Sequence, residues 1–338
     1  MAGRNGSGGG SGGLDVLGIG NAIVDVLAHT TDSDLAAMGL AKGVMTLVDH
    51  ATSDSIYRRM GPGVEVSGGS CANTMAGIAA LGGRAGYVGK VKRDQLGEVF
   101  RHDLRAQGVR FETDPAADGP ATARCLILVT PDAQRTMQTY LGACVELGPE
   151  DVDASLVADA GVTYLEGYLW DPPEAKKAFL KAAEIAHAAG RKVALSLSDP
   201  FCVERHRDEF RDLVANHVDI LFANEAEITA LFRSDFDAAV AAVAGHCEVA
   251  AITRGAMGSV VVNGGGVLAC AAEPVTRVVD TTGAGDLYAA GFLHGLSQGR
   301  DLSTCGRLGG LCAAEIISHI GARPEADLAE LAARAGLT

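Results

Sequence analysis

Short hydrophobic runs alternate along the chain with longer segments in which apolar positions recur every three to four residues. Between residues 175 and 189 this recurrence predicts a helix, and Gly190 follows as a stop signal. Strand-like runs occupy residues 14–20, 162–170, 192–198, 218–223 and 248–253. The alternation of strands and helices predicts an α/β fold with a mostly parallel central sheet.

Two segments, at about residues 22–50 and 109–146, have a different pattern. Their hydrophobic runs, such as CLILVT at residues 125–130, are short and separated by turn-forming sequences. We expect these segments to form a small β lid around the first βα units of a domain that spans residues 14–338. Residues 1–13 are mostly glycine and serine, so we expect a disordered tail there.

Composition narrows the classes of protein to be considered. Of the 338 residues, 48% are hydrophobic and 21% are charged, and the formal net charge is −14. Such an acidic chain argues against a nucleic-acid or membrane partner, and no apolar run is long enough to span a bilayer. The eight cysteines are scattered without a C-x-x-C pair, which indicates buried thiols in the reducing cytoplasm.

The segment VVDTTGAGDLYAAGFLHG, residues 278–295, places an aspartate directly after a Gly-Ala-Gly turn. Residues 277–279 are predicted to form a short strand, and the apolar positions after Asp286 recur at helical spacing. A helix that starts at a glycine turn presents unpaired amides and the positive end of its dipole, which favour an anion. A carboxylate at this place indicates a chemical role.

Another glycine motif, VSGGSCANTMAGIAALGG, begins earlier in the chain, at Val66; we call it the first glycine motif and the one at Asp286 the second. Gly68 and Gly69 permit a ligand to approach the backbone, and Ser70 and Asn73 project from the first turn of a predicted helix. An ordinary glycine turn with a serine cap is the alternative. Phosphoryl transfer needs hydrogen-bond donors for the transferred group and a base for the acceptor hydroxyl, and the turn at Asp286 supplies both.

Three other nucleotide-binding signatures do not fit. In GIGNAI, Ile23 replaces the third glycine of the dinucleotide motif. A Walker loop ending at Gly89-Lys90 would have Arg84 in place of its first glycine and Val91 in place of Ser or Thr. Neither H-R-D nor D-F-G occurs, which excludes the protein-kinase arrangement.

The pair SGGSCAN and DTTGAGD, in this order, resembles the ribokinase (PfkB) family of carbohydrate and nucleoside kinases. The resemblance covers the chain after the tail and implies a three-layer α/β/α sandwich with a small β-sheet lid. Five segments resemble the adenosine-kinase branch of that family in particular: GNAIVDVLA, SGGSCANTMAGIA, LSLSDPF, VDILFANEAE and CGRLGGLCAAEIISHIG.

The resemblance implies that Asp286 is the catalytic base and that the backbone amides from Gly283 through Ala284 and Gly285 to Asp286 form an anion hole. It also implies that Arg135, on the lid, clamps the transferring phosphate when the lid closes. A solvated loop arginine is the alternative for Arg135.

For the acceptor, the resemblance implies that Asp25 holds the ribose hydroxyls with help from Gly69 and Asn73. A turn residue at a strand end is the alternative for Asp25, but an unpaired carboxylate in the apolar segment AIVDVLA is costly. The residues expected to bind the acceptor lie in the segments GNAIVD and SGGSCAN and are Asn21, Asp25, Gly68, Gly69, Ser70 and Asn73. The purine is expected to lie against Leu47, Leu141, Tyr168 and Phe201, for which ordinary core packing is the alternative.

On the nucleotide side, Asn224 and Glu227 match the N-x-x-E pair that organises magnesium through water in this family. A capping box explains the same pattern without a metal. The residues expected to border ATP are Asn224, Thr253, Gly255 and Gly258, whereas Arg254 fits no pattern.

Together with the two glycine motifs, the resemblance implies ATP- and Mg²⁺-dependent phosphorylation of the 5′-hydroxyl of adenosine, giving AMP. A sugar kinase of the same fold, acting on ribose, fructose or 2-keto-3-deoxygluconate, is one alternative. A catalytically silent ligand-binding protein is another, although such a protein has no need of a base at Asp286. The sequence leaves open whether the protein is a monomer or a homodimer.

Overall fold

The computed structural model describes residues 13–132 and 134–338. All of the predicted tail except Gly13 lies outside the described residues. In the described part of the chain, no helix is both long enough and apolar enough to cross a membrane.

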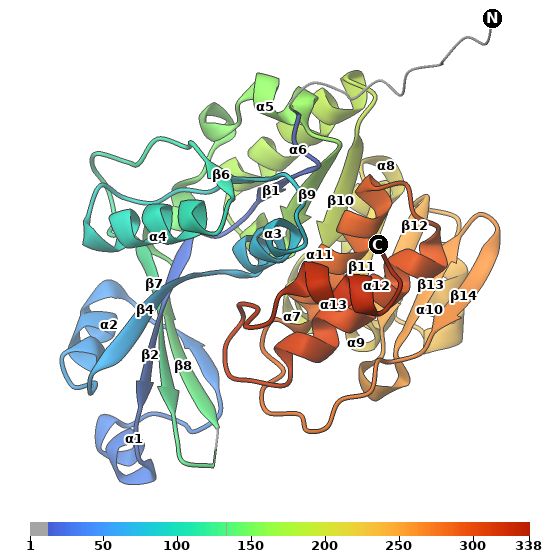
Figure 1. Cartoon of the computed structure of the whole chain (residues 1–338). Helices are drawn as coiled ribbons and strands as arrows, with labels where there is room; N and C mark the ends of the chain where they lie inside the picture. The colour runs from blue at the N-terminus through green and yellow to red at the C-terminus, as the bar shows by residue number, and fades with distance from the viewer. Residues whose placement is uncertain (1–12, 133) are drawn as a thin grey trace, which may run out of the picture.

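A nine-stranded sheet forms the centre of the molecule (Figure 1). Every neighbouring pair is parallel except β12–β13 and β13–β14, which are antiparallel. The prediction of a mostly parallel sheet is therefore confirmed. In spatial order the strands are β14 (Gly266–Cys270), β13 (Ser259–Asn263), β12 (Val249–Thr253), β11 (Ile220–Asn224), β10 (Lys192–Ser196), β9 (Val162–Glu166), β1 (Val16–Ile19), β5 (Ala85–Val88) and β6 (Arg110–Phe111).

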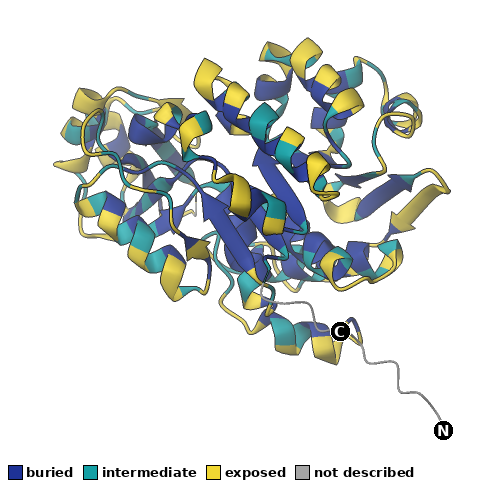
Figure 2. Cartoon of the chain, turned by 90° about the horizontal axis from the view of Figure 1, so that it is seen from above, coloured by how far each residue is buried: buried dark blue, intermediate teal, exposed yellow. Residues whose placement is uncertain are grey.

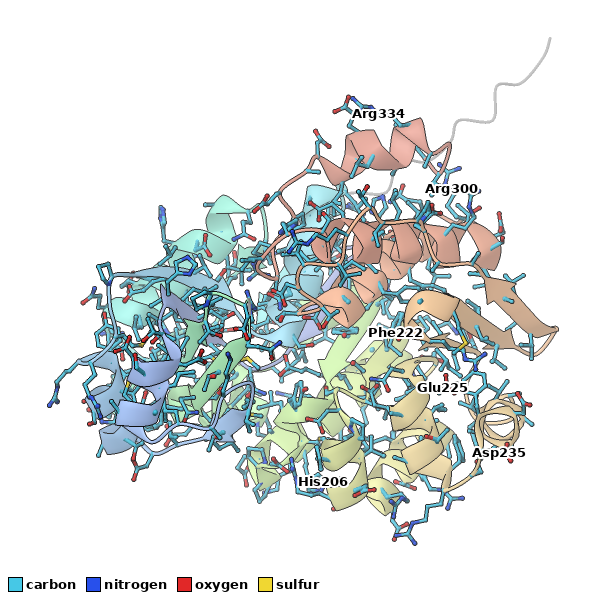
Figure 3. All side chains as sticks on the ribbon, turned by 90° about the horizontal axis from the view of Figure 1, so that it is seen from below. His206, Phe222, Glu225, Asp235, Arg300 and Arg334 are labelled. Carbon is cyan, nitrogen blue, oxygen red and sulfur yellow. The ribbon has the colours of Figure 1, made fainter. Side chains whose placement is uncertain are left out.

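Alternate residues of the buried strands belong to two separate hydrophobic cores, one on each face of the sheet. In β11, Ile220 and Phe222 face one core, whereas Leu221 and Ala223 face the other. Phe222, labelled in Figure 3, packs edge-on against Phe292 with ring centroids 5.5 Å apart. Figure 2 shows these strands buried between helices whose outer sides are exposed. The predicted three-layer α/β/α arrangement is confirmed.

Each face has its own set of helices. Those of the first core are α3 (Ser70–Ala80), α4 (Gln95–Ala106), α11 (Ala284–Ser297), α12 (Leu302–Ile316) and α13 (Leu328–Arg334). Those of the second core are α5 (Ala154–Asp159), α6 (Pro173–Ala188), α7 (Pro200–Arg205), α8 (Arg207–Asn216), α9 (Glu225–Phe232) and α10 (Phe236–Val243). Four short 3₁₀ helices connect elements: η1 (Gly142–Glu146), η2 (Pro149–Asp151), η3 (Gly167–Trp170) and η4 (Gly255–Met257).

A second, five-stranded sheet forms a lobe beside the main sheet, at the lower left in Figure 1. One face is covered by α1 (Asp32–Met38) and α2 (His50–Tyr57), through Leu35 and Ile56. The other face carries a small apolar cluster around Cys125, Ile127 and Val129. In spatial order its strands are β3 (Met45–Leu47), β8 (Arg135–Tyr140), β7 (Ala123–Val129), β2 (Ile23–His29) and β4 (Gly63–Gly68).

Two strands lie differently from the sequence-based expectation for the lid. Strand β4 belongs to the second sheet although it falls outside residues 22–50 and 109–146, because it pairs with β2. Strand β6 falls inside the second of those segments but joins the large sheet beside β5. Both placements depend on pairing with strands that are distant in sequence.

The strand predicted at residues 277–279 does not form. This segment is irregular, and the amide of Val279 donates to the carbonyl of Ile317 at 2.8 Å, at the end of α12. Val278 is exposed, so this segment does not have the buried apolar side chains of a central strand. Its backbone bonds to the end of α12 instead of extending the sheet.

Glycines let α11 and α12 approach each other closely. A Cβ added to Gly291 would lie 2.4 Å from the carbonyl oxygen of Leu308, and one added to Gly309 would lie 2.8 Å from that of Tyr288. These obstacles are backbone atoms of the facing helix, which cannot move independently. The position of α11, and hence of Asp286 in its first turn, depends on this contact.

The helix contact yields a test of stability. Gly291→Ala should lower the free energy of unfolding by about 2–3 kcal/mol, because the added methyl group must displace the backbone of α12. Gly310→Ala is the matched control, since a Cβ there would meet no atom closer than 3.7 Å. It should be neutral or stabilise by up to about 1 kcal/mol through helix propensity. Urea unfolding of both variants measures the difference, and equal effects would contradict the packing described.

Candidate active site

The candidate site lies where the strand order of the large sheet reverses. From β1 the chain first builds β5 and β6 on one side and later builds β9 to β12 on the other. Ligands of open α/β sheets bind at the carboxyl ends of the strands at such a point. Asn21 follows β1 and Glu166 ends β9, and the Asn21 amide donates to Glu166 Oε1 at 2.7 Å.

Glu166 also fixes the start of α3. Its Oε2 accepts from the amide of Cys71 at 2.9 Å, and only 1% of the residue is exposed. Burial raises the pKa of Glu166 to about 7, whereas the Cys71 amide and the Asn21 side chain lower it. Glu166 was not among the residues predicted from the sequence. Its signal is a carboxylate at the end of the otherwise apolar strand VTYLE.

The first glycine motif needs its glycines for steric reasons. Gly69, the N-cap of α3, has φ +91°, and a Cβ there would lie 2.3 Å from the carbonyl oxygen of Asn21. A Cβ on Gly68 would lie 2.4 Å from the carboxyl carbon of Asp25. Any side chain at either position would displace the backbone or the carboxylate of the predicted acceptor site.

The two predicted motifs meet at Asp286. Its Oδ1 accepts from the hydroxyl of Ser70 at 2.6 Å, and its Oδ2 accepts from the amide of Asn73 at 2.8 Å. Burial raises the pKa of Asp286, and the hydrogen bonds from Ser70 and Asn73 and the charge of Arg323 lower it. The carboxylate is therefore oriented by two donors from the first turn of α3.

The turn before α11 presents free amides beside this carboxylate. Gly283 adopts the left-handed conformation with φ +78°, and a Cβ there would lie 2.9 Å from the Cβ of Ala322. The amide of Ala284 donates to the carbonyl of Thr281 at 3.2 Å. Within the described residues, the amides of Gly283, Gly285 and Asp286 make no backbone hydrogen bond. Three donors, rather than the whole turn, remain for an anion.

Arg135 reaches from the second sheet to this turn. Its Nη2 lies 2.9 Å from Oδ2 of Asp280, and its Nη1 donates to the hydroxyl of Thr282 at 3.1 Å. The side chains of Arg135 and Asp280 are only 9% and 10% exposed, so this ion pair is shielded from water. Asp280 also accepts from the amide of Gly321 at 3.0 Å. Arg135 is therefore not a solvated loop arginine.

Asp25 projects from β2 of the second sheet into the same region. Burial raises its pKa to about 6, Arg323 and Arg135 lower it, and Asp286 raises it further. Its side chain accepts no hydrogen bond from the described residues. A half-buried carboxylate without a partner is an open acceptor for hydroxyl groups.

The four residues predicted to hold a purine are not core residues. Leu47, Tyr168 and Phe201 are 56%, 39% and 75% exposed, and Leu141 is half-buried. Ser198, with φ +72°, follows β10, and its hydroxyl accepts from the amide of Tyr168 at 3.0 Å. This strained residue thus joins the loop carrying Tyr168 to the loop leading to Phe201.

On the nucleotide side, Thr253 ends β12 and a glycine-containing turn follows. Gly255 and Gly258 have φ +55° and +83°, and a Cβ on Gly258 would lie 2.1 Å from the carbonyl oxygen of Cys270. Arg254, which fits no sequence pattern, pairs with Glu225 at 3.0 Å and lies 3.9 Å from the centroid of the Phe236 ring. These contacts give Arg254 a structural role.

Asn224 and Glu227 form the capping box that was the alternative to a metal pair. The amide nitrogen of the Asn224 side chain donates to Glu227 Oε1 at 2.6 Å, and the backbone amides exchange bonds with the two side chains. Burial raises the pKa of Glu227 to about 7, and the Asn224 amide lowers it. Both carboxylate oxygens of Glu227 accept hydrogen bonds within this capping box.

The model of the pfkB family of carbohydrate kinases matches residues 34–328. The chain belongs to this family. PfkB kinases transfer phosphate to a hydroxyl acceptor, so the prediction of a phosphotransferase from the two glycine motifs is confirmed.

Three relatives are similar over nearly the whole length. The structure of adenosine kinase from Sinorhizobium meliloti is 55% identical with a TM-score of 0.89, covering 96% of this chain and 100% of that one. That of a probable sugar kinase from Rhizobium etli CFN 42 is 52% identical with a TM-score of 0.89, covering 96% and 99%. Adenosine kinase of Saccharomyces cerevisiae is 29% identical, covering 90% of this chain and 94% of that protein.

The state of Asp25 yields a test of pH dependence. Its folded-state pKa of about 6 exceeds the ordinary value of 3.8, so the folded protein binds this proton more tightly than the unfolded chain does. Stability should therefore fall as pH rises from about 4 to above 6. Asp25→Asn should be more stable than the wild type at pH 7.5, by roughly 1–2 kcal/mol after allowing for partial exposure, with a smaller difference at pH 4.5.

Urea unfolding at the two pH values measures this effect. Asp132→Asn is the control, because the hydrogen bond from Lys42 lowers the pKa of Asp132 to about 2. That substitution should lose stability at pH 7.5. A stability difference for Asp25→Asn that does not change with pH would contradict the raised pKa.

Proposed function

We propose that the protein transfers the γ-phosphate of ATP to the 5′-hydroxyl of adenosine, giving AMP and ADP. The observation that carries this proposal is the carboxylate of Asp286, held by Ser70 and Asn73 beside free amides at the start of α11. A base and a set of anion donors lie within one turn of chain. The similarity to the adenosine kinases of S. meliloti and S. cerevisiae supports the choice of acceptor.

In the proposed reaction, the oxygen of the 5′-hydroxyl attacks the γ-phosphorus of ATP, ADP leaves, and Asp286 accepts the proton of that hydroxyl. The amides of Gly283, Gly285 and Asp286 stabilise the charge on the transferred group. Arg135 already lies at this turn, paired with Asp280, so it can turn to the phosphate when the second sheet closes.

The site contains oxygen atoms that can accept hydrogen bonds from the ribose hydroxyls. The side-chain oxygens of Asn21 and Asn73 are buried and accept no hydrogen bond from the described residues. The half-buried carboxylate of Asp25 is a third acceptor in this region. Ribose hydroxyls can donate to all three groups, which would satisfy them. Buried acceptors without donors are costly, so a bound sugar ring relieves that cost.

The exposed apolar residues favour a nucleoside over a free sugar. Phe201 and Tyr168 follow β10 and β9, at the carboxyl ends where ligands bind, and a purine has two flat faces that such rings can cover. Leu47 ends β3 and Leu141 directly follows β8, so both would close the slot from the side of the second sheet. Ribose or fructose would leave these side chains uncovered.

ATP is proposed to bind along Asn224, Thr253, Gly255 and Gly258, at the ends of β11 and β12. The Asn224–Glu227 pair would hold Mg²⁺ through water, and the ion would neutralise the β- and γ-phosphates. The reaction would recover adenosine as AMP, a step of purine salvage. A cytoplasmic location is supported by the eight cysteines, all of which are free thiols.

The role of Asp286 is tested by Asp286→Asn. The amide keeps the shape of the side chain but cannot accept the proton, so turnover with adenosine and Mg·ATP should fall by roughly 100-fold or more. Adenosine binding, measured by calorimetry, should change little. Turnover close to that of the wild type would show that Asp286 is not the base.

The purine slot is tested by Phe201→Ala. Loss of stacking should weaken adenosine binding by about 1–3 kcal/mol, while ATP binding stays nearly intact. Tyr57→Ala is the matched control, because Tyr57 is an exposed ring on α2, which covers the opposite face of the second sheet. Both affinities can be measured by calorimetry. Equal adenosine affinity in the two variants would exclude Phe201 from the slot.

A further inference from the structure

An arginine with a buried guanidinium, Arg323, lies between the two glycine motifs and has no part in the proposed reaction. Arg323 follows α12, and its Nη2 donates to the carbonyl oxygen of Ser67 at 2.7 Å and to its hydroxyl at 3.0 Å. The Nε and Nη1 atoms are buried and have no hydrogen-bond partner among residues 13–132 and 134–338. A buried guanidinium is costly unless nearby negative charges compensate it.

The contact with Ser67 holds strand β4 of the second sheet in place where the chain enters the first glycine motif. Ser67 is fully buried and directly precedes Gly68. Its amide and hydroxyl both donate to Oδ2 of Asp103 on α4, at 2.7 and 2.6 Å. The chain of bonds from Arg323 through Ser67 to Asp103 therefore holds β4 at the point where the chain passes from the second sheet to α3.

The residues just before Arg323 contact the second motif. Ala322 lies against Gly283, where a Cβ would come within 2.9 Å of the Cβ of Ala322. The amide of Gly321 donates to Asp280, which also pairs with Arg135. Residues 321–323 thus touch the loops that carry both glycine motifs.

The charge of Arg323 acts on the two acceptor-site carboxylates. Burial raises the pKa of both Asp25 and Asp286, and Arg323 opposes this effect at both. Of the two arginines that act on Asp25, Arg323 has the larger effect and Arg135 the smaller. The fixed cation and the two anions belong to three different elements that close packing brings together.

We propose that Arg323 is a positioning residue for phosphoryl transfer, which joins the loops of the two glycine motifs and holds a positive charge between them. This inference rests on the proposed function, because it assigns Asp286 the role of base. Arg323 does not need to touch the acceptor. It acts through Ser67, by geometry, and through the carboxylates, by charge.

Other ionisable groups face the same carboxylates. Glu166 and Glu227 add negative charge near Asp286, and Asp103 compensates Arg323. Four neutral groups also lie near these carboxylates: the thiols of Cys71 and Cys125 and the phenols of Tyr164 and Tyr168. Burial raises the pKa of each of them, so they stay neutral between pH 5.5 and 9. The acidic limb of a pH profile therefore reports carboxylates, and Arg323 is the cation common to Asp25 and Asp286.

The test is the pH dependence of kcat/KM between pH 5.5 and 9, with adenosine and saturating Mg·ATP. Arg323→Gln should move the acidic limb upward by about one pH unit, so that activity falls about tenfold more at pH 6 than at pH 8.5. Arg323→Lys keeps the positive charge, so its acidic limb should lie within about 0.3 pH unit of that of the wild type. A uniform loss at every pH, with the limb unmoved, would overturn the proposal.

Two further variants complete the experiment. Arg334→Gln is the control, since Arg334 is an exposed arginine on α13, at the outer edge in Figure 3, and its profile should match the wild type. Asp103→Asn removes a negative charge beside Arg323 and should move the limb downward. If Arg323→Gln does not fold, Asp103→Asn provides the test. An acidic limb that stays in place or moves upward in Asp103→Asn would then overturn the proposal.

Failure of the proposed function is distinguishable from failure of this inference. If the wild type ignores adenosine but phosphorylates a sugar, the acceptor assignment is wrong, and the same profiles can be recorded with that sugar. If the wild type phosphorylates adenosine and Arg323→Gln leaves the limb unmoved, the role of Arg323 is wrong while the acceptor assignment stands.

Discussion

The site depends on a carboxylate held at the start of a helix by donors from another helix. Asp286 lies in the first turn of α11, and Ser70 and Asn73 reach it from the first turn of α3. Two helix N-termini favour negative charge in the same place, which offsets part of the cost of burying it. The glycine contacts between α11 and α12, and the bond from Cys71 to Glu166, fix the two helices in this relation.

The second sheet is tied to the same point by charge. Asp25 comes from β2, Arg135 from β8, and Asp280 from the loop before α11, so each carboxylate or guanidinium belongs to a different part of the fold. Closure of a lid over such a site brings charges together and excludes water, which strengthens their interaction. The arrangement supports an enzyme rather than a silent binding protein, because its most constrained group, Asp286, is the residue that we propose as the base.

Local sequence patterns were enough for the central strands, for α3 and α11, and for the two glycine turns, because their periodicity and turn residues are encoded in short segments. They failed where pairing decides structure. The register of β4 beside β2 and the placement of β6 depend on distant strands, and residues 277–279 bond to the end of α12 instead of forming a strand. Glu166 and Arg323 were not predicted from the sequence, for a related reason. Each is a single charged residue whose partners, such as Asn21 and Ser67, lie more than a hundred residues away.

The identity of the acceptor is the central claim, and a competition assay tests it most directly. The purified protein would be given Mg·ATP with equal concentrations of adenosine, ribose, fructose and 2-keto-3-deoxygluconate, and the phosphorylated products identified by ³¹P NMR. The carboxylate at Asp286 and the exposed rings of Tyr168 and Phe201 predict AMP as the dominant product. A sugar phosphate as the dominant product, with adenosine left unchanged, would contradict the nucleoside assignment.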